Sequence, residues 1–331
     1  MRMLAVAELH IHIEGTLEPE LLVRLSARNG IALPTTDVAE LRARYRFSTL
    51  QSFLDLYYAN LRVLQQEQDF YDLARAYLAR AAAAGVRRAE IFFDPQAHLA
   101  RGVPLAAVFG GLTAALADGA REDQISADLI LCFLRDLGAD AARQALRESL
   151  EFRDMFIGVG LDSTEVGYPP ALFEQVYQMA AAEGLRLVAH AGEEGGPAYV
   201  REALDLLHVE RVDHGVRSME DPGLVAELRD RRIALTVCPL SNVALHVVGT
   251  LGEHVLPGML DSGLLACVNS DDPAYFGGDV DDNLAAVRDE FGLDAGTLAV
   301  LARNSFDACF APAADKAGWK AEVDAWLAVQ P

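Results

Sequence analysis

Short apolar runs alternate with amphipathic segments along most of this 331-residue chain. Continuous apolar runs of this length are typical of strands in a parallel sheet that is buried on both faces. Regular strand–helix alternation with eight strands predicts an α/β fold, the (β/α)8 TIM barrel. An open doubly wound sheet is the alternative, but the G-x-G-x-x-G turn that would follow its first strand is absent. The strands are expected at residues 5–12, 89–93, 127–133, 156–161, 185–189, 211–213, 233–237 and 265–269.

A long, mostly helical connection separates the first two expected strands. It is too long for a simple crossover, and an insertion at one rim of a barrel usually forms a lid or a pocket wall. Within it, an apolar and aromatic group is the candidate for a hydrophobic cover: Phe53, Leu54 and Tyr57. Further helices are expected after the last strand, at 281–290, 294–310 and 314–328. No Pro/Gly/Ser-rich linker interrupts the chain, so a single domain over residues 1–331 is expected.

Composition limits the classes of binding partner and the cellular compartment that can be expected. The net charge is −21, which argues against nucleic acid and anionic membranes because both are bound through basic patches. The uncharged stretch 234–252 contains Pro239, Ser241 and Asn242, so it is interpreted as a buried strand followed by a polar loop and a short helix rather than as a membrane span. Four scattered cysteines and the lack of a signal peptide favour a reducing, cytoplasmic location. Whether the chain forms a homo-oligomer is left open.

Two histidines in the first expected strand begin a candidate metal site. His10 and His12 are two residues apart, so on a strand they project from the same face. The neighbouring Leu9, Ile11 and Ile13 point the other way into apolar packing. Two half-exposed histidines on an ordinary strand would show the same spacing, so further ligands are needed to decide.

Those ligands occur where later strands end. The carboxyl ends of barrel strands meet at one face, which is where catalytic groups gather. Burying many imidazoles and carboxylates there costs free energy unless they bind something. We therefore expect a catalytic metal, with zinc favoured and iron(II) or another divalent ion as the alternative. The strand-end sequences are D-S-T-E at 162–165, H-A-G-E at 190–193, D-H-G at 213–215 and N-S-D-D-P at 269–273.

H-x-H-x-E-G and these later motifs together resemble the adenosine/adenine deaminases of the amidohydrolase superfamily, over about residues 8–310. The resemblance implies a barrel with one zinc ion, and its ligands would be His10, His12, His190 and Asp271. The only lysines lie near the C-terminus, so a barrel lysine that could bridge two metal ions is absent, which favours a mononuclear site.

The same resemblance implies roles in the hydrolysis of a 6-aminopurine. Glu193 would protonate the ring at N1, as a positioned carboxylic acid can. His214 would orient the attacking hydroxide, and Asp271 would count among the catalytic residues as well as the ligands. Asp272 would hold the purine N7.

Two features favour the free base over the nucleoside. Adenosine deaminases usually carry an aspartate that contacts the ribose, where this chain has the longer Glu14. The loop L-D-S-T-E-V-G around Ser163 also lacks the glycine that usually lies beside the purine. We therefore expect Asp272, Glu14 and Ser163 to bind adenine, which is converted to hypoxanthine and ammonia in purine salvage. Adenosine and N6-substituted adenines are the alternative substrates.

Other classes of function have to be weighed against this one. A catalytically dead purine-binding barrel would keep the fold, but it would be expected to lose Glu193 or Asp271, and both are present. Another mononuclear hydrolase, acting on a pterin or a cyclic amide, is the further alternative. The expected partners are thus a small purine base and water, with no nucleic acid and no membrane.

Overall fold

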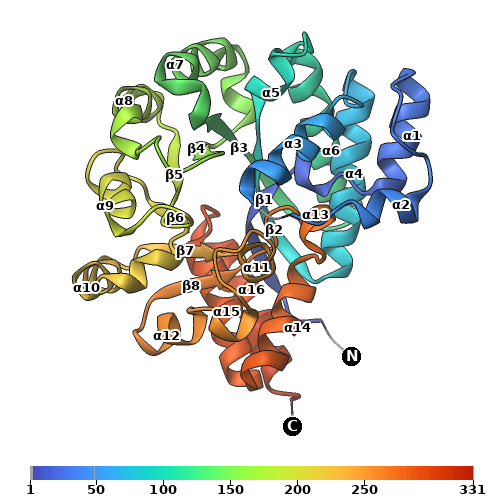
Figure 1. Ribbon diagram of the computed structural model, residues 1–331. Helices are drawn as coiled ribbons and strands as arrows, with labels where there is room; N and C mark the ends of the chain where they lie inside the picture. The colour runs from blue at the N-terminus through green and yellow to red at the C-terminus, as the bar shows by residue number, and fades with distance from the viewer. Residues whose placement is uncertain (1–2, 48, 331) are drawn as a thin grey trace.

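The computed structural model describes residues 3–47 and 49–330, and within them eight parallel strands form one sheet in sequence order. Helices surround the strands on the outside, as Figure 1 shows in a view into the barrel. The predicted (β/α)8 barrel is therefore confirmed. The strands are β1 (Val6–His12), β2 (Val86–Phe93), β3 (Ser126–Leu134), β4 (Gly158–Asp162), β5 (Arg186–Ala191), β6 (Arg211–His214), β7 (Ala234–Val237) and β8 (Leu265–Val268).

The seam between β8 and β1 is closed by the chain that follows β8. The Leu9 N–H donates to the Asn269 side-chain oxygen at 2.8 Å. The backbone of Asp271 then exchanges hydrogen bonds with β1, donating to the His10 carbonyl at 3.0 Å and accepting from the His12 N–H at 3.1 Å. Closure of the barrel therefore fixes the backbone of three predicted metal ligands against one another.

The helices between the later strands agree with the alternation seen in the sequence. Short helices that the sequence did not indicate, α5 (Pro95–Leu99) and α13 (Pro273–Phe276), begin directly after strand ends. A short helix α11 (Pro239–Ala244) follows β7, as expected. The longer outer helices are α6 (Leu105–Glu122), α7 (Gly138–Ser149), α8 (Glu174–Ala182), α9 (Pro197–Asp205), α10 (Pro222–Arg231) and α12 (Leu256–Asp261).

The insertion after β1 is helical, as predicted. Its helices are α1 (Pro19–Asn29), α2 (Val38–Ala43), α3 (Leu50–Leu61) and α4 (Glu67–Ala83). The first begins at Pro19 and ends at Gly30, whose φ of 65° suits a residue without Cβ. In Figure 1, α3 lies across the end of the barrel that faces the viewer, while α4 packs outside beside α6.

The C-terminal helices close the other side of the molecule. They are α14 (Val280–Phe291), α15 (Ala295–Ala308) and α16 (Ala313–Leu327). The Ser305 hydroxyl of α15 accepts a hydrogen bond from the Ala7 N–H at 2.8 Å, which ties this helix to β1. Within the described residues, no helix is both long enough and apolar enough to cross a membrane.

Candidate active site

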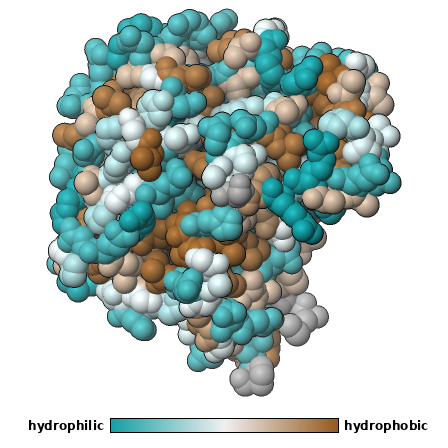
Figure 2. All heavy atoms as spheres, in the orientation of Figure 1, coloured by the Kyte–Doolittle hydropathy of each residue, from teal (hydrophilic) through white to brown (hydrophobic). Residues whose placement is uncertain are grey.

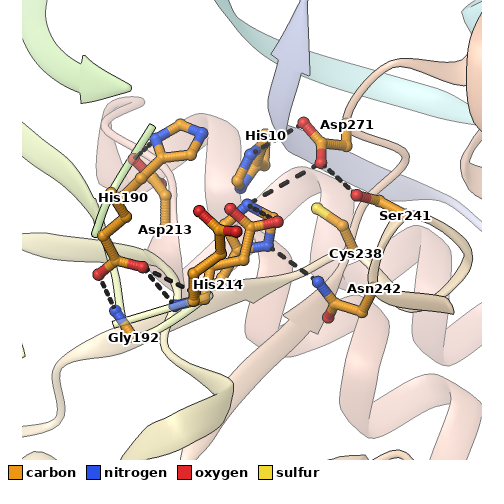
Figure 3. Close-up of polar contacts among 12 residues, drawn as sticks. His10, His190, Gly192, Asp213, His214, Cys238, Ser241, Asn242 and Asp271 are labelled. Carbon is orange, nitrogen blue, oxygen red and sulfur yellow. Dashed lines mark hydrogen bonds and ion pairs between the residues drawn. The ribbon is translucent and has the colours of Figure 1, made fainter. Parts of the chain in front are cut away.

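His10, His190, His214 and Asp271 converge at the carboxyl ends of the strands, as Figure 3 shows. His12 joins this cluster beside Asp271. The Nε2 atoms of His10 and His12 lie 3.3 and 3.4 Å from Asp271 Oδ1. His12 Nε2 is also 3.2 Å from His190 Nε2. The donor atoms of His10, His190, His214 and Asp271 lie within 4.8 Å of one another. The structure thus brings together all four predicted ligands, and it adds His214 to the same cluster.

Hydrogen bonds behind the cluster turn the Nε2 atoms inward. The Thr236 hydroxyl donates to Asp213 Oδ1 at 2.9 Å, so its oxygen is free to accept from His10 Nδ1 at 3.0 Å. With its proton on Nδ1, His10 presents an unprotonated Nε2 that has no hydrogen-bond partner among the described residues. Asp213 Oδ2 lies 3.7 Å from His190 Nδ1, which is beyond hydrogen-bond distance but places a carboxylate on the outer side of that ring. Carboxylates and carbonyls behind metal-binding histidines commonly play this role.

The segment after β7 supports the opposite side of the cluster. The Ser241 hydroxyl donates to Asp271 Oδ2 at 2.6 Å, and thus acts on the aspartate rather than on His214. Asn242 places its amide nitrogen 3.4 Å from His214 Nδ1, while its oxygen is 3.1 Å from His254 Nε2. The loop and short helix predicted for this stretch therefore help to position Asp271 and His214.

The protonation states suit a divalent ion. Burial lowers the pKa of His12 to about 4, and burial with the neighbouring histidines lowers the pKa of His190 well below its usual value. Burial alone would raise the pKa of Asp271, but His10 and its neighbours hold it well below the usual range. His10 differs, because Asp271 raises its pKa above the usual value against the effect of burial, so an ion bound there would displace a proton. Neutral imidazoles and an ionised carboxylate are the forms that bind a metal ion. The donor set therefore fits zinc or iron(II).

Glu193 and His214 face each other beside the cluster. Glu193 Oε1 lies 3.5 Å from His214 Nε2, which is itself 3.9 Å from Asp271 Oδ2. Burial, followed by the nearby carboxylates of Asp271 and Glu165, raises the pKa of Glu193 well above its usual value. Burial lowers the pKa of His214 well below its usual value. A protonated carboxyl group next to a neutral imidazole provides a proton donor beside a ring that can orient a reactant.

Glu165 fixes the loop that carries Glu193. Its Oε1 accepts the Gly192 N–H at 2.7 Å. Its Oε2 accepts three more backbone N–H groups, of Glu193 at 3.1 Å and of Glu194 and Gly195 at 2.8 Å. Glu165 thus holds four consecutive N–H groups in and after the H-A-G-E motif, a contact that no sequence pattern indicated.

Asp272 lies in the cavity next to Asp271, and Gly15 explains how it fits. A Cβ atom on Gly15 would lie 1.9 Å from Asp272 Oδ1, so only glycine allows the carboxyl group this position. Burial and the adjacent Asp271 raise the pKa of Asp272 well above its usual value. The Gly of the E-G motif therefore makes room for a predicted substrate-binding residue.

Glu14 occupies a different place from the one expected. Its side chain is fully buried, and it is not among the residues that line the cavity. Glu14 Oε1 lies 2.7 Å from His98 Nε2 and accepts the Asp94 N–H at 3.1 Å. Direct contact between Glu14 and substrate thus stays a prediction, while its contacts in the structure support the turn after β2.

A cavity lies among these side chains at the carboxyl ends of the strands. The insertion forms one wall through the predicted Phe53, Leu54 and Tyr57, joined by Leu50 and Tyr58. Around the opening, Figure 2 shows hydrophobic surface in the middle of the face, over α11. The polar lining is made of His12, Asp94, Asp162, Ser163, His190, Glu193, His214, Asp271 and Asp272. An apolar wall with a few polar groups is typical of a small-molecule site.

Asp94 is the lining residue that the sequence analysis missed. It follows β2 directly, and its carboxyl group is within hydrogen-bonding reach of Asp162. Burial, followed by Asp162 and Glu14, raises the pKa of Asp94 well above its usual value, and burial raises the pKa of Asp162 to about 7. The signal that could have found Asp94 is its place at a strand end, the rule that identified the other site residues.

A family model described as adenosine deaminase matches residues 6–326. This chain belongs to the adenosine deaminase family. It is 59% identical to an adenine deaminase of Streptomyces coelicolor over 322 residues, which cover 97% of this chain and 95% of that protein. The crystal structure of an adenine deaminase from Arthrobacter aurescens is 54% identical, with a TM-score of 0.97, and the match covers 98% of this chain and all (100%) of that one.

A further solved member of this group carries a metal ion. The amidohydrolase from Burkhoderia ambifaria, solved with bound Zn, is 30% identical with a TM-score of 0.90, over 99% of this chain and 93% of that chain. The predicted resemblance to the adenine deaminase branch is thus confirmed, and with it the expectation of an enzyme of that class.

Proposed function

We propose that this chain hydrolyses adenine to hypoxanthine and ammonia, using one zinc ion held by His10, His12, His190 and Asp271. The observation that carries the proposal is the convergence of imidazole Nε2 atoms on Asp271, with His10 Nδ1 engaged by Thr236 behind the site. The adenine deaminases at 54–59% identity support adenine as the substrate. Iron(II) is the alternative ion for the same donors.

The residues around the cluster then share the proton transfers. A divalent ion bound there supplies a nucleophile near neutral pH, because it lowers the pKa of water. His214 Nε2 orients the attacking hydroxide. The carboxyl group of Glu193, protonated in this buried position, donates to the purine N1, so that the negative charge developing in the ring is neutralised. The Glu193 carboxylate then moves the proton of the C6 hydroxyl to the amino group, which leaves as ammonia, and a 6-oxopurine remains. Ionisation of the next water returns a proton to Glu193.

Two further residues hold the ring. Asp272, whose pKa is raised by burial and by Asp271, donates from its carboxyl group to N7. The Ser163 hydroxyl lines the cavity and has no hydrogen-bond partner among the described residues, so it is free to donate to N3. Ser163 has a φ of 70°, and this turn is what directs the residue after β4 into the cavity.

The proposal extends to the setting of the enzyme. The described part of the chain has four buried free thiols, Cys132, Cys238, Cys267 and Cys309, which support a reducing compartment such as the cytoplasm. The proposed reaction converts one free purine base into another, which supports a role in purine salvage. The hydrogen bond from β1 to α15 supports one domain over the whole chain.

The test uses protein stripped with a chelator and reloaded with zinc or iron(II). Ammonia release is measured with adenine, adenosine and N6-methyladenine at equal concentration. We expect activity only after reloading, with one metal ion per chain and adenine turned over fastest. Asp271→Asn should lose the metal, while Asp261→Asn, at the exposed end of α12, should keep it. Full activity of the stripped protein, or a preference for adenosine, would contradict the proposal.

A further inference from the structure

Asp94 is a buried acidic residue that the proposed mechanism does not use. It is 2% exposed and lines the cavity, and its Oδ1 atom has no hydrogen-bond partner among the described residues. An unsatisfied polar atom at this depth costs free energy unless a bound ligand completes it. The Asp94 carboxyl group is also within hydrogen-bonding reach of Asp162, whose own Oδ1 has no hydrogen-bond partner among the described residues.

A chain of buried contacts holds Asp94 in place. The Asp94 N–H donates to Glu14 Oε1 at 3.1 Å, and the same oxygen lies 2.7 Å from His98 Nε2. His98 Nδ1 is 2.5 Å from Arg101 Nη2, and Arg101 Nη1 donates to the Leu64 carbonyl at 3.1 Å. Glu14 therefore positions the backbone of Asp94 and leaves the Asp94 side chain directed at the cavity. Such a supported position is what a specificity contact requires.

The order of the strands around the barrel fits the perimeter of a purine. Glu193 follows β5 and serves N1, and Ser163 follows β4 and serves N3. Asp272 follows β8 and serves N7, and His214 follows β6, beside C6. The remaining strands between β4 and β8 around the barrel are β3, β2 and β1. Asp94 follows β2 and lines the cavity on this side. Passing from N3 to N7 around the ring, the remaining nitrogen is N9.

We propose that the Asp94 carboxyl group accepts a hydrogen bond from N9–H of free adenine and thereby selects the base over purines substituted at N9. The inference rests on the proposed function, because the positions of N1 and N7 orient the ring. Either protonation state of Asp94 leaves an oxygen that accepts this hydrogen. A nucleoside lacks the N9 hydrogen, and its sugar would meet the buried carboxyl group. Sites built to pair a polar group reject analogues without it by factors of about 10⁴.

The experiment compares adenine with 9-methyladenine as substrates of the metal-loaded enzyme. For the wild type we expect kcat/KM to favour adenine by about 10³-fold. Asp94→Ala should lower kcat/KM for adenine about 100-fold and change that for 9-methyladenine less than about threefold, so the ratio falls to about 10. Asp94→Asn keeps an acceptor oxygen and the native size, so the ratio of kcat/KM for adenine to that for 9-methyladenine should fall only to about 100. The exposed Asp136→Ala, which removes a charge near the same rim, should keep the wild-type ratio.

The outcomes separate the two proposals. If Asp94→Ala and Asp94→Asn slow both substrates equally, Asp94 has a structural role and the inference is wrong, although adenine deamination stands. If the wild type does not deaminate adenine, the proposed function itself is wrong. Where Asp94→Ala fails to fold, the ratio measured for the equally sized Asp94→Asn still decides: an unchanged ratio overturns the inference.

Discussion

Glu165 illustrates how single buried side chains, remote from the reacting atoms, position this site. Its carboxylate binds the N–H groups of residues 192–195, and the loop so fixed carries Glu193. Hydrogen bonds to an ionised carboxylate are stronger than those between neutral groups. The orientation of the proposed proton donor therefore depends on a residue of the neighbouring strand end.

Replacing Glu165 should separate catalysis from binding. In Glu165→Gln the side-chain NH2 group faces backbone donors, so the loop shifts and Glu193 moves away from the ring. We expect kcat for adenine to fall about 100-fold while KM changes little, because small misplacements of a catalytic group have effects of this size. Steady-state kinetics measures both. The exposed Glu148→Gln is the control, and an unchanged kcat in Glu165→Gln would contradict this role.

At the scale of residues, the sequence predicted which side chains gather at the site better than it predicted the contacts that each side chain makes. The strand-end motifs placed His10, His190 and Asp271 in one cluster because parallel strands end at one face. The role of Glu165 could not be predicted, since it depends on backbone N–H groups that carry no sequence signal. Glu14 was expected in the cavity, but its contacts are to His98 and to the backbone behind the cavity.

At the scale of elements, the helical insertion forms one wall of the cavity. α3 supplies the cavity wall, and its first turn is held by a capping box in which Thr49 accepts the Ser52 N–H at 3.1 Å. The sequence predicted a helical connection here, with Phe53, Leu54 and Tyr57 as its apolar group. It did not predict the β8–β1 seam, because the seam is made by residues beyond the last strand and one side-chain oxygen of Asn269.

Loss of the Thr49 cap should destabilise α3, the helix of the insertion that lines the cavity. Thr49→Ala removes the acceptor for the Ser52 N–H and should cost about 1 kcal/mol of unfolding free energy. Since α3 lines the cavity, KM for adenine should also rise severalfold. Asp37→Ala removes the equivalent cap of α2, which does not line the cavity, and should cost similar stability with KM unchanged. Urea unfolding and steady-state kinetics of both variants test this, and an equal change of KM in the two would contradict this role of α3.

At the scale of the whole molecule, acid sensitivity should follow from buried histidines. Burial lowers the pKa of His254 to about 4, from an ordinary value of 6.5. Its Nδ1 accepts the Leu256 N–H at 3.1 Å, so a proton there would break this contact. The unfolded chain therefore binds the proton more readily than the folded one, and stability is complete above about pH 6.5 and lost as pH falls towards 4.

The size of this effect is measurable by urea unfolding. Between about pH 7.5 and pH 5, His254 should contribute about 2 kcal/mol to the loss of unfolding free energy. His254→Gln keeps a donor for Asn242 but does not titrate, so it should reduce the pH dependence by that amount. The exposed His208→Asn should leave the pH dependence as in the wild type. Equal slopes for wild type and His254→Gln would show that His254 does not titrate as described.

The whole account depends most directly on a comparison of wild type with Glu193→Gln in adenine turnover. Both proteins should bind one zinc ion, because Glu193 is not among the proposed ligands. We predict that the wild type converts adenine to hypoxanthine with one ammonia released per turnover, and that Glu193→Gln is about 10³-fold slower. A Glu193→Gln enzyme with full zinc content and the wild-type rate would contradict the proton-donor assignment and, with it, the proposed mechanism.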